Sequence, residues 1–377
     1  MLIDTLPIKD PVHKYQKCIV VLFTGKRRVL STCQLNGGYQ EGLTAVFNND
    51  IKPGEGMECR LLAPTYEEHL KLTAESLGLD PCTSAGMSTA ANMDHAAIRT
   101  ERCGALAVTA VVTGGIDVNG GRVGDPASWD ELEDASVPVK AGTINIMLFM
   151  NTDLTPGALA RAMVTCTEAK TAVLQELLAP SRYSMGIATG SGTDSTIVVC
   201  NAESEICLTD AGKHSKLGEL VGRAVKAAVR EALYWETGLS PESQHHVMKR
   251  LDRFGITEET LWEEFRKKIP GTGRADFSER LYQIGRNGGM VAAVSLYVHL
   301  LDQLLWGMLS AGEAHEMGRK LLAMMGAATE SRTEPEAQDM VTQMIRELKE
   351  ALNDLAASWK IRTEPYLQAD CFRSPQN

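Results

Sequence analysis

The stretch GTINIMLFM at residues 142–150, with LTPGALARAMVTCTEAKTA at residues 154–172, decides the fold of the first half of the chain. Its first part is a nearly uninterrupted apolar run of strand length, which indicates a strand buried on both faces. The second part opens with Thr155, a residue type that caps helices, and Pro156, which suits a first helical turn. We therefore expect a buried strand that leads into a helix ending near Leu178.

Further strands and helices surround this unit within residues 1–238. Their order is strands first, then strand and helix in alternation, which predicts an α+β domain around a mixed sheet with packed helices. The expected strands cover residues 18–24, 28–32, 57–63 and 105–113, with two more around a Gly-rich bend in 186–200. The expected helices cover residues 64–77 and about 215–235.

The second half has a different amino-acid composition. It is rich in Leu, Met, Glu, Arg and Lys at helical spacing. TGLSP at 237–241 combines a helix stop with a new helix start, so we place the boundary between residues 238 and 239. Residues 239–377 are expected to form an all-helical domain. Its predicted helices are 241–254, 257–268, 277–285, 289–309, 312–327 and 333–359. Residues 291–309 are apolar nearly all round, which indicates the centre of a bundle or the contact of a homo-oligomer. A further hypothesis for this domain is a docking or oligomerisation module.

The composition indicates a globular protein and excludes some classes of partner. The 377 residues are 44% hydrophobic and 23% charged, and the net charge of −10 argues against nucleic-acid binding. Asp4, Lys9 and Asp10 do not fit a signal peptide, and we find no run of about 18 apolar residues, so we expect a cytoplasmic protein without a membrane partner. Nine cysteines without a Cys-x-x-Cys pair indicate reduced thiols and no zinc site.

Glu168 is the first candidate for catalysis. It lies in the middle of the expected helix among small residues such as Thr165 and Ala172, which allow a ligand to approach. A carboxylate in this setting can act as a general base on water, or as an acid if burial raises its pKa. The alternative, a solvated helix carboxylate paired with a neighbour, is equally supported by the spacing.

ATGSGTD at 188–194 is the second candidate. Gly190 and Gly192 allow backbone N–H groups to form a nest for an oxyanion or a phosphate, and Asp194 can orient a histidine or hold a proton. No lysine follows the glycines, so a P-loop is excluded. The alternative is a tight hairpin in which Asp194 bonds its own backbone, and on this signal alone the alternative is favoured.

Two histidines complete the candidates. His214 precedes the helix that Ser215 opens, where it can pass protons near neutral pH, although for a lone histidine a surface capping turn is the favoured alternative. Asp94 and His95 are neighbours, so at most one of them faces a site on a strand. The Gly-containing loop 117–125 is either a lid or plain surface. We find no Gly-x-Ser-x-Gly elbow, and Cys166 lies within a helix and looks structural.

Seven short segments occur in an order that resembles the adenosylcobinamide amidohydrolase family, over about residues 18–235. The segments are LNGG at 35–38, STAA at 88–91, VTAVVT at 108–113, GTINI at 142–146, TEAKTA at 167–172, ATGSGTD at 188–194 and HSKLGE at 214–219. GGIDVN at 114–119 departs from the loop that family members commonly carry there. Residues 240–377 lie outside the resemblance.

The resemblance implies hydrolysis of the amide that joins a corrin propionyl side chain to aminopropanol in adenosylcobinamide. The products are adenosylcobyric acid and 1-amino-2-propanol, a step of cobalamin salvage. The partner is then a small corrinoid whose cobalt belongs to the substrate, and no cofactor is required. A divalent metal held by His95, Glu168, Asp194 and His214 is an alternative that their spacing does not support.

Our mechanistic hypothesis is attack of water on the amide carbonyl. Glu168 or His214 is the base, and Asp194 orients the base or relays its proton. Backbone N–H groups of the Gly-rich turn stabilise the oxyanion. The expected substrate-binding residues are Asn36, His95, Thr113, Asn145, Thr189, Gly190, Gly192 and Thr193. Two rivals stay open: an amidohydrolase for another corrinoid or tetrapyrrole amide, favoured by the divergent loop, and a corrinoid-binding protein without catalysis.

Overall fold

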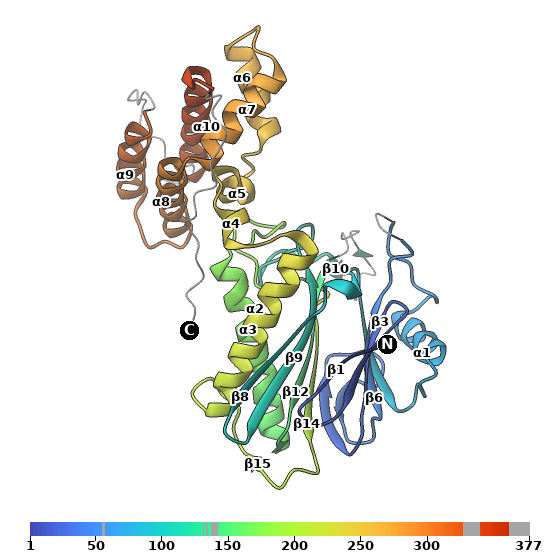
Figure 1. The fold of residues 1–377 in the computed structure, drawn as a ribbon. Helices are drawn as coiled ribbons and strands as arrows, with labels where there is room; N and C mark the ends of the chain where they lie inside the picture. The colour runs from blue at the N-terminus through green and yellow to red at the C-terminus, as the bar shows by residue number, and fades with distance from the viewer. Residues whose placement is uncertain (55–56, 131, 133–134, 137–141, 327–339, 362–377) are drawn as a thin grey trace. The chain divides into compact units, whose positions relative to one another are not determined.

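The computed structural model describes residues 1–54, 57–130, 132, 135–136, 142–326 and 340–361, and the chain forms two compact units, Met1–Gln244 and His245–Asn377 (Figure 1). The predicted class, mixed sheets followed by a helical region, is confirmed. Leu239 packs into the core of the first unit, and the short helix α4 (Pro241–Gln244) belongs to that unit. The first unit thus extends a few residues past the predicted boundary at 238.

The first unit contains two mixed sheets, where a single one was expected. The five-stranded sheet has the order β1 (Leu2–Thr5), β2 (Pro11–Tyr15), β3 (Cys18–Leu22), β6 (Ala45–Asp50) and β7 (Ser84–Thr89). The six-stranded sheet has the order β5 (Gly38–Gln40), β4 (Arg27–Ser31), β14 (Ser195–Asn201), β12 (Thr143–Met150), β9 (Leu106–Gly115) and β8 (Ala97–Cys103). Each sheet has one parallel pair, β6 with β7 and β12 with β14. Two small ladders join β10 (Trp129–Asp130) to β11 (Ala135–Ser136) and β13 (Asp153–Leu154) to β15 (Cys207–Leu208).

The two sheets pack face to face and helices cover their outer faces, which gives four layers (Figure 1). Helices α2 (Pro156–Glu176) and α3 (Lys216–Thr237) cover the six-stranded sheet, and α1 (Tyr66–Ser76) covers the five-stranded sheet. Strand β12 shows the alternation: Ile146 and Leu148 face the helices, whereas Met147 and Phe149 face the other sheet. Because both faces are covered, the strand reads as the continuous apolar run in the sequence.

Most of the predicted elements are present, and some predictions differ from the structure. The helix expected at 241–254 is divided into Pro241–Gln244, Val247–Leu251 and a 3-10 turn at Asp252–Phe254. Residues 57–63 are not a strand. Within 186–200 only β14 is a strand, because Ile187 and Gly190 form isolated bridges with Pro180 and Gly121 instead of a ladder. The caps are as expected: Thr155 accepts a hydrogen bond from the N–H of Ala158, and Ser215 accepts one from the N–H of Gly218.

The described part of the second unit is helical. Its helices are α5 (Val247–Leu251), α6 (Glu258–Lys268), α7 (Arg274–Arg286), α8 (Gly288–Leu305), α9 (Ala311–Met324) and α10 (Met340–Ser358), with a short 3-10 turn at Asp252–Phe254. Helix α8 packs against α5, α7, α9 and α10. The start of the predicted helix 333–359 lies outside the described residues.

One helix of the described residues, α8, is long and apolar enough to cross a membrane by length and composition, and a third of it is buried within the protein. A core helix passes the same test, and Val294, Tyr297 and Leu301 of α8 belong to the hydrophobic core of the second unit.

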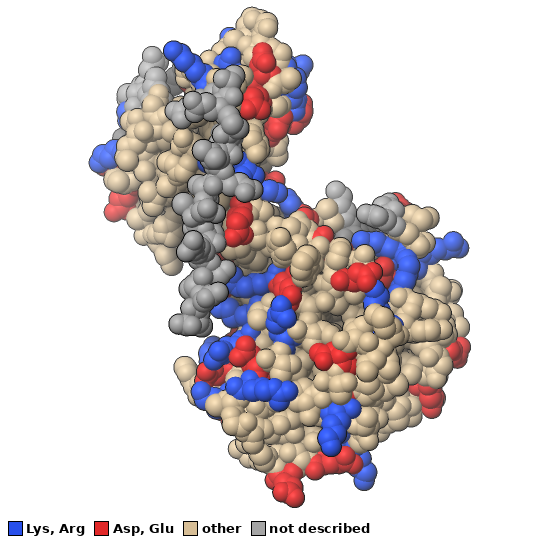
Figure 2. Space-filling model, in the orientation of Figure 1, with Lys and Arg blue, Asp and Glu red and all other residues tan. Residues whose placement is uncertain are grey.

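Acidic and basic side chains lie interspersed over the face shown in Figure 2.

Candidate functional site

Two adjoining cavities meet at the turn formed by residues 189–195. The smaller cavity, of about 460 Å³, is lined by the end of β7, the start of β12 and the turn. The larger cavity, of about 760 Å³, is lined by the turn, by α2 and by residues 119–129. Trp129, Gly192 and Thr193 line both cavities. These volumes are typical of sites for small molecules.

Asp194 holds the turn together. Its Oδ1 accepts hydrogen bonds from the N–H of Ile144 (2.7 Å) and from Oγ of Ser191 (2.8 Å). Its Oδ2 accepts one from the N–H of Ser191 (3.0 Å) and forms an ion pair with Lys170 on α2. The side chains of Lys170 and Asp194 are only 12% and 10% exposed. The carboxylate is thus fully engaged, and its charge is balanced within the protein.

Gly192 presents a free backbone donor at the junction of the cavities. Among the described residues its N–H has no hydrogen-bond partner, and a Cβ at this position would meet nothing within 4 Å. The next residue is fixed, because Thr193 Oγ1 donates to the carbonyl of Gly142 (2.9 Å) and the Thr193 carbonyl accepts from Thr143 Oγ1 (2.7 Å). An anchored turn with an unsatisfied N–H is suited to bind an oxyanion.

A buried amide cluster joins the two sheets beneath the smaller cavity. Asn145 Nδ2 donates to Oδ1 of Asn48 and to the carbonyl of Ser88, both at 2.9 Å. Asn145 Oδ1 accepts from the N–H of Ser195 (3.2 Å), and Asn48 Nδ2 donates to Thr113 Oγ1 (2.8 Å). Asn145 and Thr113, which the sequence predicted to bind substrate, therefore form the framework under the cavity.

Ser88 lies on the β7 wall of the smaller cavity with a histidine behind it. The Ser88 N–H donates to Oη of Tyr66 (2.8 Å), and Ser88 Oγ lies 3.1 Å from Nε2 of His69 on α1. Nδ1 of His69 accepts from the N–H of Leu62 (3.1 Å). Burial lowers the pKa of His69 below its ordinary value of 6.5. The ring is therefore neutral at pH 7.

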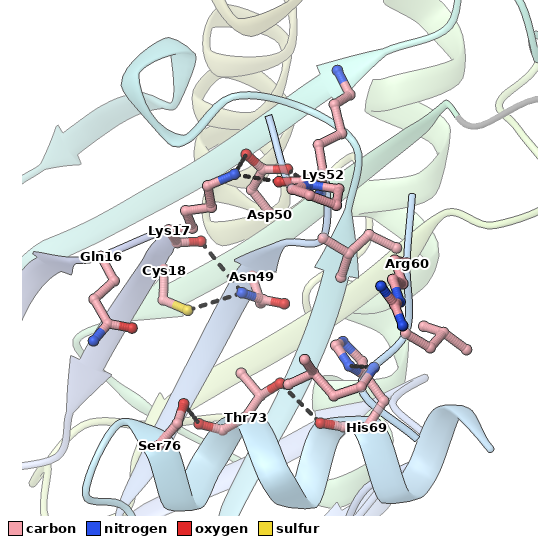
Figure 3. A pocket seen from close by; sticks show the side chains of 14 residues that line it. Gln16, Lys17, Cys18, Asn49, Asp50, Lys52, Arg60, His69, Thr73 and Ser76 are labelled. Atoms are coloured by element: carbon pink, nitrogen blue, oxygen red, sulfur yellow. Dashed lines mark hydrogen bonds and ion pairs between the residues drawn. The ribbon is translucent and has the colours of Figure 1, made fainter. Parts of the chain in front are cut away.

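His69 also lines a third cavity, of about 530 Å³, between the five-stranded sheet and α1. Figure 3 shows Lys17, Asp50 and Lys52 grouped on one side of it and Arg60 and His69 on the other. Burial raises the pKa of Asp50. The His69–Ser88 contact thus joins a residue of this cavity to a residue of the smaller one, and Ile51 lines both cavities.

The structure brings together five of the predicted residues, namely Thr189, Gly190, Gly192, Thr193 and Asp194. Thr189 Oγ1 accepts from the N–H of Val123 (2.9 Å), and Gly121 exchanges backbone hydrogen bonds with residues 189 and 190. The Gly-containing loop is therefore anchored to the turn and forms a wall of the larger cavity. Lys170 and Thr171 of α2 face the same cavity.

Glu168 and His214 lie elsewhere. Glu168 is half exposed and forms an ion pair with Lys213 at 3.0 Å in a shallow groove between α2 and α3. His214 is exposed in the turn before α3. Glu168 and Lys170 are two positions apart on the helix, so they point in different directions, and Lys170 is the one that contacts Asp194.

His95 and Asn36 have partners away from the turn. His95, in a 3-10 turn at Met93–His95, lies 2.8 Å through Nδ1 from Oε2 of Glu236, which also accepts from the N–H of Asn92 (3.0 Å). Asn36, at a φ of 49°, donates to the carbonyls of Pro81 (2.7 Å) and Ser84 (2.8 Å). Asn36 therefore clamps a loop to the start of β7. Within the described residues, no group of three or more His, Cys, Asp or Glu side chains gathers as a metal site would require.

Sequence reasoning missed four residues of the site, namely Lys170, Ser88, His69 and Trp129. Thr167, Lys170 and Thr171 follow the i, i+3, i+4 spacing of one helix face, and this signal was available in the sequence. The contact of His69 with Ser88 depends on α1 packing against β7 and has no local signal. Trp129 is 60% exposed at the junction of the cavities.

Comparisons with known proteins identify the family of this chain. An uncharacterized protein of Methanocaldococcus jannaschii is 35% identical over 235 residues, which cover 59% of this chain and 88% of that relative. A protein of Pyrococcus horikoshii OT3 with a known crystal structure aligns with a TM-score of 0.29 and 13% identity, over 62% of this chain and 81% of that one, a likeness too low to inform the fold. Residues 3–241 match the family described as adenosylcobinamide amidohydrolase. The chain therefore belongs to the adenosylcobinamide amidohydrolase family, a family of hydrolases that act on amide bonds.

Proposed function

We propose that the protein hydrolyses the amide between a corrin propionyl side chain and aminopropanol in adenosylcobinamide, and so serves cobalamin salvage. One observation carries the proposal: four of the segments that resemble the family, 88–91, 142–146, 167–172 and 188–194, line the two adjoining cavities. Segments far apart in the sequence thus form one site, and this site contains an oxyanion donor and a buried carboxylate.

The shape of the site suits a large ring with a short side arm. The exposed indole of Trp129 lies at the junction and offers a flat apolar surface for the macrocycle, and Val123 is exposed in the larger cavity. In our proposal the corrin ring lies over the larger cavity and the aminopropanol arm enters the smaller one. The cobalt belongs to the substrate.

In the proposed reaction, water attacks the carbonyl carbon of the amide. The carbonyl oxygen takes up the negative charge and binds the N–H of Gly192. The water passes a proton to Oγ of Ser191, whose own proton moves to Oδ1 of Asp194, 2.8 Å away. When the carbon–nitrogen bond breaks, the proton returns by the same route to the leaving amine. Lys170 holds the carboxylate in place. Glu168 and His214 stay predictions for the base.

We also propose a cytoplasmic place of action and a small-molecule partner. The described cysteines are free thiols, which suits a reducing compartment. The reaction uses water as its only co-reactant, so we propose that no added cofactor is required.

The test is to incubate the purified protein with adenosylcobinamide and to follow adenosylcobyric acid and 1-amino-2-propanol by mass spectrometry. Turnover of both products supports the proposal, and an equally treated Asp194→Asn variant serves as the control. Corrinoid binding with a spectral shift but no amine would favour the binding-protein alternative. Activity on other corrinoid amides alone would favour a different substrate. Full activity after treatment with a chelator would exclude a divalent metal.

A further inference from the structure

We propose that the Ser88 hydroxyl is a second hydrogen-bond donor to the carbonyl oxygen of the substrate amide, and that His69 orients it as a positioning residue. The inference rests on the proposed function. It adds a donor on the five-stranded sheet to the Gly192 N–H, which lies in the turn before β14 of the other sheet. Two converging donors are the usual composition of an oxyanion hole.

The backbone of Ser88 is fixed on both sides. Its N–H donates to Tyr66 Oη (2.8 Å) and its carbonyl accepts from Asn145 Nδ2 (2.9 Å). The residue is 8% exposed and lines the smaller cavity. Its hydroxyl is therefore the one group of Ser88 that is left to contact a ligand.

The contacts of His69 decide the direction of the Ser88 hydroxyl. A neutral imidazole carries one N–H, and Nδ1 of His69 is an acceptor because the N–H of Leu62 points at it (3.1 Å). The proton therefore lies on Nε2, which donates to Ser88 Oγ (3.1 Å). The ring is 1% exposed and stays neutral. His69 thus occupies a lone pair of the hydroxyl oxygen and leaves the hydroxyl proton free.

The hydroxyl proton of Ser88 has no acceptor among the described residues. A buried hydroxyl donor without an acceptor is unfavourable, so a ligand acceptor in the cavity would satisfy it. Asn145 links Ser88 to the turn, because its side chain bonds both the Ser88 carbonyl and the Ser195 N–H. Ser88 and Gly192 thus both line the smaller cavity.

This arrangement is the reverse of a serine nucleophile with a histidine base. In that mechanism the histidine nitrogen next to the serine carries no proton and accepts the serine proton. Here the same nitrogen is a donor, so Ser88 remains uncharged and contributes through its own O–H. Water stays the nucleophile.

The experiment compares kcat and KM on adenosylcobinamide for the full-length wild type and four variants. Ser88→Ala should lower kcat on the order of 10²–10³-fold with KM changed by less than about threefold, the effect of losing one oxyanion donor. Ser88→Thr keeps the hydroxyl and should stay within about tenfold of the wild type. His69→Gln can keep an N–H donor toward Ser88 and should retain activity, whereas His69→Leu should approach Ser88→Ala. Circular dichroism melts verify that each variant is folded.

A second readout is independent of turnover. NMR of ¹⁵N-histidine-labelled protein should show His69 protonated on Nε2 and not on Nδ1. A proton on Nδ1, a kcat of Ser88→Ala equal to the wild type, or a covalent corrinoid acyl adduct on Ser88 would each overturn the inference. A wild type that releases no aminopropanol would refute the proposed function itself, whereas an active wild type with a fully active Ser88→Ala refutes the inference alone.

Discussion

Lys170 and Asp194 form their ion pair against the backbone of Gly190, where an added side chain would force the ion pair to shift. A Cβ at Gly190 would lie 2.4 Å from Oδ2 of Asp194 and 2.7 Å from Nζ of Lys170. Gly192, two residues on, has open space around it. Gly190 is therefore required because the ion pair lies close to its backbone, whereas Gly192 borders the cavities.

This difference gives a matched pair of variants. We expect Gly190→Ala to lower the free energy of unfolding by about 1–3 kcal/mol, the typical effect of inserting a carbon into a packed site. Gly192→Ala should leave it nearly unchanged, because its Cβ meets no atom within 4 Å. Chemical denaturation of both variants measures the difference. Equal stability of the two would contradict the close packing at Gly190.

The buried ion pair itself is the second prediction. Lys170→Met leaves the Asp194 carboxylate buried without its counter-charge, which typically costs about 3–5 kcal/mol. We also expect kcat to fall at least about 100-fold as the turn shifts. Lys213→Met is the control, because Lys213 pairs with Glu168 at an exposed site where ion pairs contribute about 0–1 kcal/mol. If both lysine variants behave alike, Asp194 does not depend on Lys170.

Glu168→Gln decides whether Glu168 is the general base. We expect kcat to fall by less than about tenfold, because the carboxylate is half exposed, pairs with Lys213 and lies off the helix face that meets Asp194. Steady-state kinetics alongside Asp194→Asn give the comparison. A loss of two or more orders of magnitude in Glu168→Gln would restore Glu168 as the base.

Trp129→Ala tests the placement of the macrocycle. We expect KM for the corrinoid to rise about tenfold with kcat little changed, since the indole contributes ring contact and not chemistry. Trp235→Ala is the matched control: Trp235 is 55% exposed on α3, and neither cavity is lined by it. Unchanged KM in Trp129→Ala would place the corrin elsewhere.

His69 also predicts a pH dependence of stability. Burial lowers its pKa in the folded state below the 6.5 of the unfolded chain, so below pH 6.5 the unfolded state binds more protons. The stability present above pH 6.5 is therefore lost as the pH falls toward the folded pKa, by at most about 1.4 kcal/mol per pH unit. Urea unfolding from pH 5 to 8 should show this slope, and His69→Gln should reduce it. An unchanged slope would mean that His69 titrates normally.

Local signals made the helices predictable and left the sheets incomplete. Thr155 with Pro156 and Ser215 mark the starts of α2 and α3 because a cap is an interaction within four residues. The split of the strands into two sheets depends on pairings between distant residues, such as β3 with β6, which no local pattern encodes. The strand expected at 57–63 has suitable residues but no neighbouring strand to pair with in the structure.

The same distinction applies to the site. The turn at 188–194 was predictable because its glycines and its aspartate are neighbours in the sequence and are typical of turns. Its partner Lys170 lies 24 residues away, and Ser88 lies 19 residues from His69, so both contacts exist only once helices pack on sheets. Glu168 stays a prediction because a carboxylate suggests a base, and the packing of α2 brings the residue two positions on, Lys170, into contact with Asp194.

The amide cluster under the smaller cavity has a consequence for the order of folding. Asn145 bonds partners 57 and 97 residues away, which belong to the other sheet. Contacts that close such long loops form late, because the chain entropy of closure must be overcome first. During synthesis Ser88 precedes Asn145 by 57 residues, so Ser88 must wait for its partner. We therefore expect the wall of the smaller cavity at Ser88 to be among the last parts of the first unit to become ordered. In our proposal the corrinoid then binds only after the first unit has folded.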